Sequence, residues 1–200
     1  MDRETGYTFG GTYSFGRDTA TGGSSANCPG QVPGSFLACR DLSAMMAFDS
    51  SLVGASVAYD EQRGNAGATD GLTTPSQKHI RTSIGGYLFF GPVRLGAGWY
   101  GQKIDAVVGQ TINIYYGGAT WHPVPTIELA GQMARQIVER TNNATLYIAR
   151  LEYSMSLRTA LYVMYAYMNN SSKSTVPFAG STVGPGLNSQ GILVGMRQSF

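Results

Sequence analysis

Six charged side chains are the best candidates for chemistry in this sequence, because each stands at a regular position within an alternating segment. They are Arg81, Arg94, Glu128, Arg150, Glu152 and Arg197. Successive side chains of a strand point to opposite faces, so parity sets these six opposite the apolar side chains of their segments. Guanidinium and carboxylate groups that face water attract ions of opposite charge. Four arginines against two glutamates favour a mild preference for anions, and the alternative is that the six only pair with each other across strands.

Catalytic chemistry has little support in the sequence. His79 and His122 are the only histidines, and we expect both to be solvated, the first beside a loop and the second in a proline-flanked turn. No Gly-x-Ser-x-Gly motif is present, and no carboxylate pair has a spacing that indicates acid–base work. A hydrolase that uses His79 with a nearby serine remains the catalytic alternative. The sequence predicts that the protein is not an enzyme.

One glycine pattern resembles a dinucleotide-binding fingerprint. Residues 96–101 read Gly-Ala-Gly-Trp-Tyr-Gly, which matches G-x-G-x-x-G. That fingerprint binds a pyrophosphate only where the N-terminus of a helix follows it. Another alternating segment follows here, and small residues on the inner face of a strand explain the glycines better. We therefore expect no cofactor.

The two cysteines, Cys28 and Cys39, lie in a loop rich in proline and glycine. A local disulfide between them is plausible if the chain crosses an oxidising compartment. Closing a loop of this size contributes about 3 kcal/mol in the chain-entropy treatment. The alternative is a pair of free thiols. Neither cysteine has the spacing of a zinc site, so no metal is expected.

The composition is typical of an all-β protein. Only 13% of the 200 residues are charged, and 27 are glycine; soluble domains have about 25% charged residues and would carry about 14 glycines at this length. Twelve tyrosines and eight phenylalanines add residues that favour strands. No apolar run reaches the length of a transmembrane helix. The net charge of +2 gives no reason to expect a nucleic-acid partner.

Ten segments alternate between apolar and polar or small residues. They fall in residues 5–15, 42–48, 53–59, 80–88, 93–102, 112–116, 127–133, 147–153, 161–167 and 190–200. In the sixth segment Ile112, Ile114 and Tyr116 form one face, opposite Asn113 and Tyr115. Residues 60–78 and 103–109 are predicted to be loops. Residues 121–125 are predicted to be a turn, because two prolines interrupt a hydrogen-bonded ladder.

The connections between these segments also alternate, since the first, third, fifth, seventh and ninth are the longer ones. Short periplasmic turns and long outer loops are the topology of an outer-membrane β-barrel. The predicted fold is therefore all-β, an antiparallel up-and-down transmembrane β-barrel of about ten strands, partial or narrow. A soluble β-sandwich is the alternative, but it would not sort its connections by length in this way.

The end of the chain carries the most specific signal. In residues 190–200, parity sets Val194, Met196 and the C-terminal Phe200 on one face. This ending resembles the last strand of Gram-negative outer-membrane porins, particularly the beta-proteobacterial general porin family. Residues 144–162 are similar to the penultimate hairpin of that family, and residues 4–11 are similar to a strand in its middle. The resemblance covers essentially the whole chain.

Porins of this family are trimers of sixteen-stranded barrels, each around a water-filled channel. The resemblance implies a bacterial outer-membrane protein for passive diffusion of ions and small hydrophilic solutes, with lipid as a partner and a homotrimer at full length. The six charged residues would then line the pore. Tyr7, Tyr13, Trp99, Tyr116, Tyr153 and Tyr167 suit aromatic girdles at the membrane interfaces or a contact between subunits.

The ten segments are fewer than the family's sixteen strands. We interpret residues 1–200 as one barrel domain that forms the C-terminal part of a porin, without its signal peptide and about six further strands. Two alternatives to a channel remain open: a non-conducting outer-membrane barrel or adhesin, and an inactive porin fragment.

Overall fold

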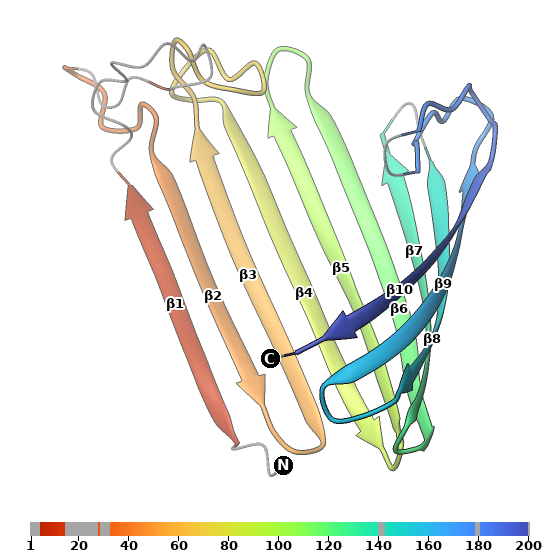
Figure 1. The fold of residues 1–200 in the computed structure, drawn as a ribbon. Coiled ribbons are helices and arrows are strands. Elements are labelled where there is room, and N and C mark those ends of the chain that lie inside the picture. The colour runs from red at the N-terminus through yellow and green to blue at the C-terminus, as the bar shows by residue number, and fades with distance from the viewer. Residues whose placement is uncertain (1–4, 15–27, 29–32, 140–142, 179–180, 200) are drawn as a thin grey trace.

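The computed structural model describes residues 5–14, 28, 33–139, 143–178 and 181–199. These residues form one sheet of ten antiparallel strands, in which each strand pairs with its neighbours in sequence order (Figure 1). The strands are β1 (Gly6–Ser14), β2 (Asp41–Asp49), β3 (Val53–Arg63), β4 (Lys78–Phe90), β5 (Val93–Asp105), β6 (Gln110–Val124), β7 (Ile127–Val138), β8 (Ala144–Ser154), β9 (Thr159–Asn170) and β10 (Ser189–Gln198). The predicted all-β, up-and-down fold is confirmed.

The register sorts the side chains of neighbouring strands onto two faces. Val57 of β3 pairs with Ile84 of β4, and Ile84 pairs with Trp99 of β5. Register partners point to the same side, so such rows form one apolar surface, which we call the outward face. The opposite surface carries glycine, serine and most of the charged strand residues, and we call it the concave face.

The sheet curls without closing (Figure 1). Strands β1 to β5 lie in a broad, gently twisted wall, and β8 to β10 bend round in front of it. Within the described residues, β1 pairs only with β2 and β10 only with β9. Ten strands thus make a curved wall with two open edges, whereas a closed barrel was one of the expected outcomes.

Large apolar side chains lie mainly on the surface of this sheet. Phe9 is 71% exposed and Val194 is 74% exposed, whereas the fully buried Leu72 and Ala38 lie in connections. A soluble protein does not expose so continuous an apolar surface without a partner for it. The exposed apolar side chains of the outward face are explained if this face contacts membrane hydrocarbon instead of a protein core.

The long connections gather at one end of the sheet and the short turns at the other, as Figure 1 shows. The short turns follow β2, β4, β6 and β8, and the one after β4 consists of Gly91 and Pro92, with Gly91 at φ +56°. β5 continues to Asp105, so the connection between β5 and β6 is shorter than expected. No helix in the described part of the chain is long and apolar enough to cross a membrane.

The expected turn at residues 121–125 is wrong, because β6 runs through it to Val124. Trp121 pairs with Leu129, and the next pair joins Val124 to Ile127, so β6 holds one extra residue there. This β-bulge places Pro123, which has no N–H, at a position that makes no ladder bond.

Two strand ends were also predicted too short. β3 reaches Arg63 and β5 reaches Asp105, so Asp60 and Lys103 belong to strands rather than loops. Asp60 pairs with Arg81 in the register, and Ile80 pairs with Lys103. The backbone ladder continues beyond the point where the apolar alternation stops, which is why the hydrophobic pattern alone missed these ends.

Candidate functional site

All six charged residues expected to share a face do so, on the concave face. Arg94 pairs with Thr120, Thr120 with Ala130, and Ala130 with Arg150, so both arginines lie in one row of the sheet. A hollow of about 650 Å³ lies along this row. Its lining includes Tyr87, Arg94, Tyr116, Gln132 and Arg150, and glycines form much of its floor.

A chain of ion pairs crosses the concave face from β6 to β10, near the short turns. His122 Nε2 lies 3.1 Å from Glu128 Oε2, and Arg150 is paired with Glu128. Arg150 also lies 3.7 Å from Glu152, whose other oxygen accepts a 2.6 Å hydrogen bond from Arg197. Glu152 is only 6% exposed, and these two arginines are the cations that it approaches.

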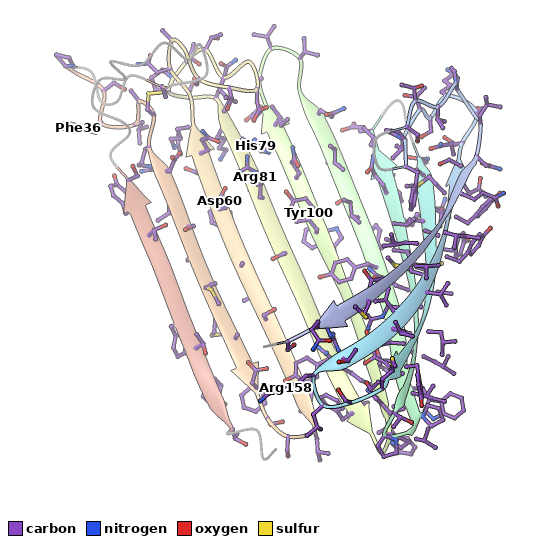
Figure 2. The ribbon with its side chains drawn as sticks, in the orientation of Figure 1. Phe36, Asp60, His79, Arg81, Tyr100 and Arg158 are labelled. Atoms are coloured by element: carbon purple, nitrogen blue, oxygen red, sulfur yellow. A yellow bond between two sulfur atoms is a disulfide. The ribbon has the colours of Figure 1, made fainter. Side chains whose placement is uncertain are left out.

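A second network lies nearer the long connections. Arg81 donates to Asp60 Oδ1 at 3.0 Å, and its second terminal nitrogen lies 3.2 Å from His79 Nδ1. The same His79 nitrogen is 2.8 Å from Asp70, a residue of the connection between β3 and β4. Figure 2 shows Asp60, His79 and Arg81 close together on neighbouring strands. His79 is 2% exposed, so the expectation of a solvated histidine is wrong for it; His122 is half-exposed.

Arg94 has a different environment from the other three arginines. Its guanidinium carbon lies 4.8 Å from the ring centroid of Tyr87 and 5.7 Å from that of Phe89. The Tyr87 hydroxyl donates a 2.6 Å hydrogen bond to Asp49 Oδ1. Within the described residues, Arg94 forms no ion pair, unlike Arg81, Arg150 and Arg197. The guanidinium lies over the Tyr87 ring and remains open to the hollow.

Three tyrosine rings of the concave face lie flat over glycines of the adjacent strand. Tyr87 faces Gly54, Tyr116 faces Gly98, and Tyr162 faces Gly195. A Cβ atom at each of these glycines would overlap the tyrosine ring. Sequence reasoning missed this pairing, although glycine at a register position opposite tyrosine is the signal that reveals it.

Tyr116 was therefore assigned to the wrong surface. In β6, Tyr115 shares the outward face with Trp99, and Tyr116 pairs with Gly98 on the concave face. The other five aromatic residues expected in girdles lie on the outward face; four are toward the ends of their strands, and Trp99 is at the middle of β5. The band near the short turns holds Tyr7, Phe48, Phe90, Trp121 and Tyr153; the band near the long connections holds Tyr13, Tyr59, Trp99, Tyr115, Tyr147 and Tyr167.

The concave face carries more carboxylates than the sequence alone indicated. Its described strands carry five carboxylates and four guanidinium groups: Asp41, Asp49, Asp60, Glu128 and Glu152 against Arg81, Arg94, Arg150 and Arg197. Asp60 falls in the predicted loop 60–78, and Asp49 lies just beyond the predicted segment 42–48. A preference for anions therefore does not follow from the number of charges on this part of the wall.

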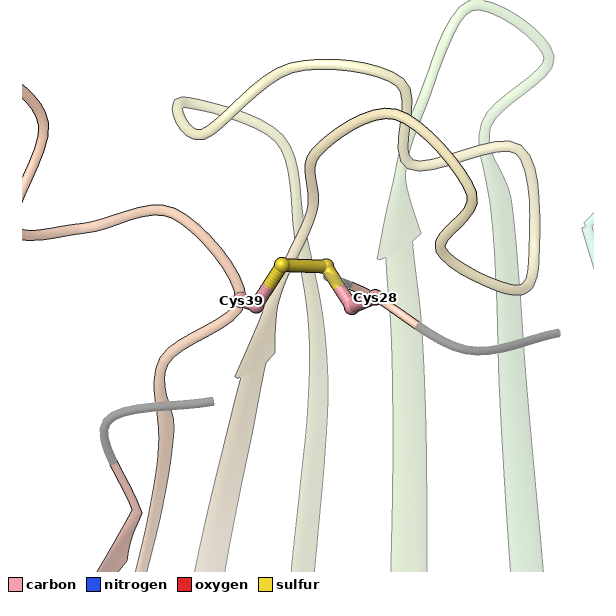
Figure 3. The surroundings of a disulfide bond; sticks show 2 residues. All are labelled: Cys28 and Cys39. Carbon is pink, nitrogen blue, oxygen red and sulfur yellow. A yellow bond between two sulfur atoms is a disulfide. The ribbon is translucent and has the colours of Figure 1, made fainter. Parts of the chain in front are cut away.

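The remaining candidates lie at the ends of the sheet. Val194 and Met196 are outward on β10, 74% and 63% exposed, and Phe200 lies outside the described residues. Cys28 and Cys39 are bonded as a disulfide with their Cα atoms 5.5 Å apart (Figure 3). The backbone N–H of Cys39 donates to Gly64 O at 3.3 Å, which ties this loop to the end of β3. No group of three metal-binding side chains occurs among the described residues.

An antiparallel sheet that is apolar on one side and charged on its concave side is the wall of an outer-membrane β-barrel. The family model of Gram-negative porins matches residues 5–173, and the chain belongs to that family. The family and the fold place the chain in the bacterial outer membrane. Its glycine pattern at residues 96–101 lies inside β5.

Solved structures of outer-membrane proteins share the fold. The anion-selective porin from Comamonas acidovorans is 23% identical with a TM-score of 0.68, and the match covers 80% of this chain and 49% of that one. Outer-membrane expressed OmpT of Vibrio cholerae is 14% identical with a TM-score of 0.54, covering 80% and 56%. In-vitro folded OmpT of the same organism is 11% identical with a TM-score of 0.57, covering 97% and 76%.

The chain spans about half the length of the first two solved structures that it matches. A comparison with curated proteins returned no significant match.

Proposed function

We propose that the concave face lines a water-filled channel through which ions and small hydrophilic solutes diffuse passively. The observation that carries this proposal is the segregation of charge: all six candidate residues lie on the concave face, opposite a continuous apolar surface. Charged side chains on the lipid side at the membrane centre would cost about 2–4 kcal/mol each. The channel requires no bond-making chemistry and no cofactor.

The barrel in this proposal is completed by further strands. The outer edges of β1 and β10 each lack a neighbouring strand among the described residues. Unpaired backbone groups in hydrocarbon cost several kcal/mol each, so an open sheet is not stable in a bilayer. We propose a sixteen-stranded barrel to which residues 1–200 contribute ten strands. One matching structure is a trimer form of OmpT from Vibrio cholerae, which supports a homotrimer.

For selectivity, we propose a weak preference for anions that depends on Arg94. The other three arginines of the concave face are paired with carboxylates, so their fields are largely cancelled within the wall. Arg94 faces the hollow without such a partner. The matching porin from Comamonas acidovorans is described as anion-selective, which supports this assignment.

Current through a planar lipid bilayer tests the channel. Refolded protein that includes the strands completing the proposed sixteen-stranded barrel should give stepwise conductance increments in potassium chloride. Folded protein that shifts its gel mobility on heating but carries no current would instead support a non-conducting barrel or adhesin. Failure to insert would support an inactive fragment. Either result contradicts the channel.

A further inference from the structure

The hollow of the concave face contains two charged side chains that form no ion pair with any described residue. Arg94 lies over the ring of Tyr87, 4.8 Å from its centroid, and Asp49 accepts a 2.6 Å hydrogen bond from the hydroxyl of the same tyrosine. Both charged residues are exposed and line the hollow. Arg150, the third charged residue of the lining, is paired with Glu128. One cation and one anion of this hollow are therefore open to a ligand.

Tyr87 keeps these two charges apart. In the register, Asp49 of β2 pairs with Gly54 of β3, and Gly54 pairs with Tyr87 of β4. Because Gly54 has no side chain, the tyrosine ring lies over it and reaches Asp49 with its hydroxyl. Arg94 approaches the ring from β5, the strand on the other side of β4. The positive group therefore lies at the face of the ring and the negative group at its hydroxyl end.

The floor of the hollow next to Tyr87 has no side chains of its own. Gly96 pairs with Tyr87 on one side and with Gly118 on the other. Among the described residues, a Cβ atom added at Gly96 would have only Gly86 O within 4 Å, at 3.6 Å, so the space above this glycine is open. Gln132, which pairs with Gly118, adds a side-chain amide at the far end of the same row. The bare backbone leaves room for the body of a small molecule.

We propose that this part of the hollow binds short peptides with free ends, which carry an ammonium and a carboxylate group. The guanidinium of Arg94 presents paired N–H donors that match the two oxygens of a terminal carboxylate, and Asp49 attracts a terminal ammonium. In a free amino acid one carbon separates the two charged groups. A dipeptide adds one extended residue of about 3.3–3.6 Å, which suits two protein charges held apart by a tyrosine ring. The inference rests on the contact of the concave face with water given under Proposed function, but not on conduction.

The test is equilibrium binding to protein that includes the strands completing the proposed barrel, refolded in neutral detergent micelles. Saturation-transfer NMR would compare glycylglycine with N-acetylglycine, which is the same molecule without its ammonium group. We expect glycylglycine to bind more tightly. Arg94→Gln should weaken the binding of both compounds about two- to fivefold, the range for one solvent-exposed ion pair. Asp49→Asn should weaken glycylglycine by a similar factor but not N-acetylglycine, because the carboxylate of Asp49 attracts only the ammonium group.

Gly96→Val tests the floor without changing any charge. Its side chain would occupy the open space above the backbone, so the binding of both compounds should weaken. Asp49→Asn keeps an oxygen that can accept the hydrogen bond from the Tyr87 hydroxyl, so we expect this variant to fold.

The matched controls remove the same two charges outside the hollow. Arg158→Gln lies in the short turn between β8 and β9 (Figure 2), and Asp105→Asn lies at the end of β5 next to a long connection. Both should leave the binding of glycylglycine unchanged. The proposal is overturned if N-acetylglycine binds as tightly as glycylglycine, or if Asp49→Asn and Asp105→Asn behave alike. Because binding is measured in micelles, protein that binds the peptide but carries no current would contradict the channel and not this site.

Discussion

Arg94 owes its position to aromatic contacts rather than to a carboxylate. The guanidinium lies over Tyr87, and the hydroxyl of Tyr87 is fixed by Asp49, so three strands hold one cation in place. Between Glu128 and Arg197, by contrast, each arginine faces a carboxylate. At the scale of single residues, the concave face thus combines a largely neutral network with one open positive charge.

Replacing Arg94 with glutamine should lower the ratio of anion to cation permeability about twofold. The cause is the loss of an uncompensated charge at the channel wall, moderated by screening across water-filled space. Reversal potentials in a potassium chloride gradient across a planar bilayer measure this ratio. Arg158→Gln, at a turn outside the hollow, is the control; an equal change in both variants would contradict the role of Arg94.

Replacing Glu152 with glutamine should destabilise the folded sheet and also raise the preference for anions. The change leaves Arg150 and Arg197 without the carboxylate that both approach. We expect a loss of about 1–2 kcal/mol, below the value for a fully buried pair because Arg197 is well exposed. Urea unfolding in micelles gives the first effect and reversal potentials give the second. Unchanged stability would show that solvent already satisfies both arginines.

At the scale of elements, neighbouring strands fit because tyrosine lies over glycine. Gly98→Ala should destabilise the sheet by about 1–3 kcal/mol, since the added Cβ overlaps Tyr116 and lies 2.8 Å from Ile84 O. Gly131→Ala is the matched control, because nothing lies within 4 Å of its added Cβ. Urea midpoints of the two variants in the same micelles make the comparison. Equal midpoints would mean that the tyrosine ring moves away at no cost.

The disulfide joins two residues of the first long connection, and Cys39 lies two residues before the start of β2. Cys28→Ser with Cys39→Ser should lower the free energy of unfolding by about 2–3 kcal/mol, in line with the small loop that the bond closes. Unfolding of the untreated protein with and without reductant provides a second measurement, which the double variant should match. A double variant as stable as the parent would show that strand pairing alone fixes this end of β2.

The presence of a strand, and the face to which each of its side chains points, were predictable from sequence where period-two alternation was strong. The segments around Val57, Ile84 and Leu95 face outward as their parity indicated. β6 was not predictable in this way, because Ile112 and Ile114 are apolar residues on the concave face. There they lie in the part of the sheet where Val138 and Met168 are also buried. Because the sheet curls, its concave side also buries apolar residues near the long connections. The apolar side of β6 there is the concave face, the opposite of what alternation indicates for a barrel strand.

The candidate site was predictable in part for the same reason. The odd or even position of each residue in its strand was enough to predict that the six charged residues share one face, because charged side chains are excluded from the lipid-facing side. It could not find Asp60 or Asp49, since both stand where the apolar pattern ends and the backbone ladder continues. The aromatic support of Arg94 depends on contacts between β4 and β5, which only the register reveals.

At the scale of the whole molecule, the two ends of the sheet differ in both connection length and charge. The long connections, the disulfide and all outward-facing strand charges are at one end, and the short turns are at the other. In a porin, long connections face the exterior and short turns face the periplasm. We expect this chain to have the same orientation in the membrane.

Single added cysteines test this orientation in cells that export the protein. Ser172→Cys, in the connection after β9, should react with a membrane-impermeant maleimide on intact cells, because this connection faces the exterior. Ser156→Cys, in the short turn after β8, should react only after the outer membrane is permeabilised. The parent chain is the control, because its two cysteines are joined in a disulfide and should stay unlabelled. Labelling of Ser156→Cys alone on intact cells would show that the orientation is the reverse.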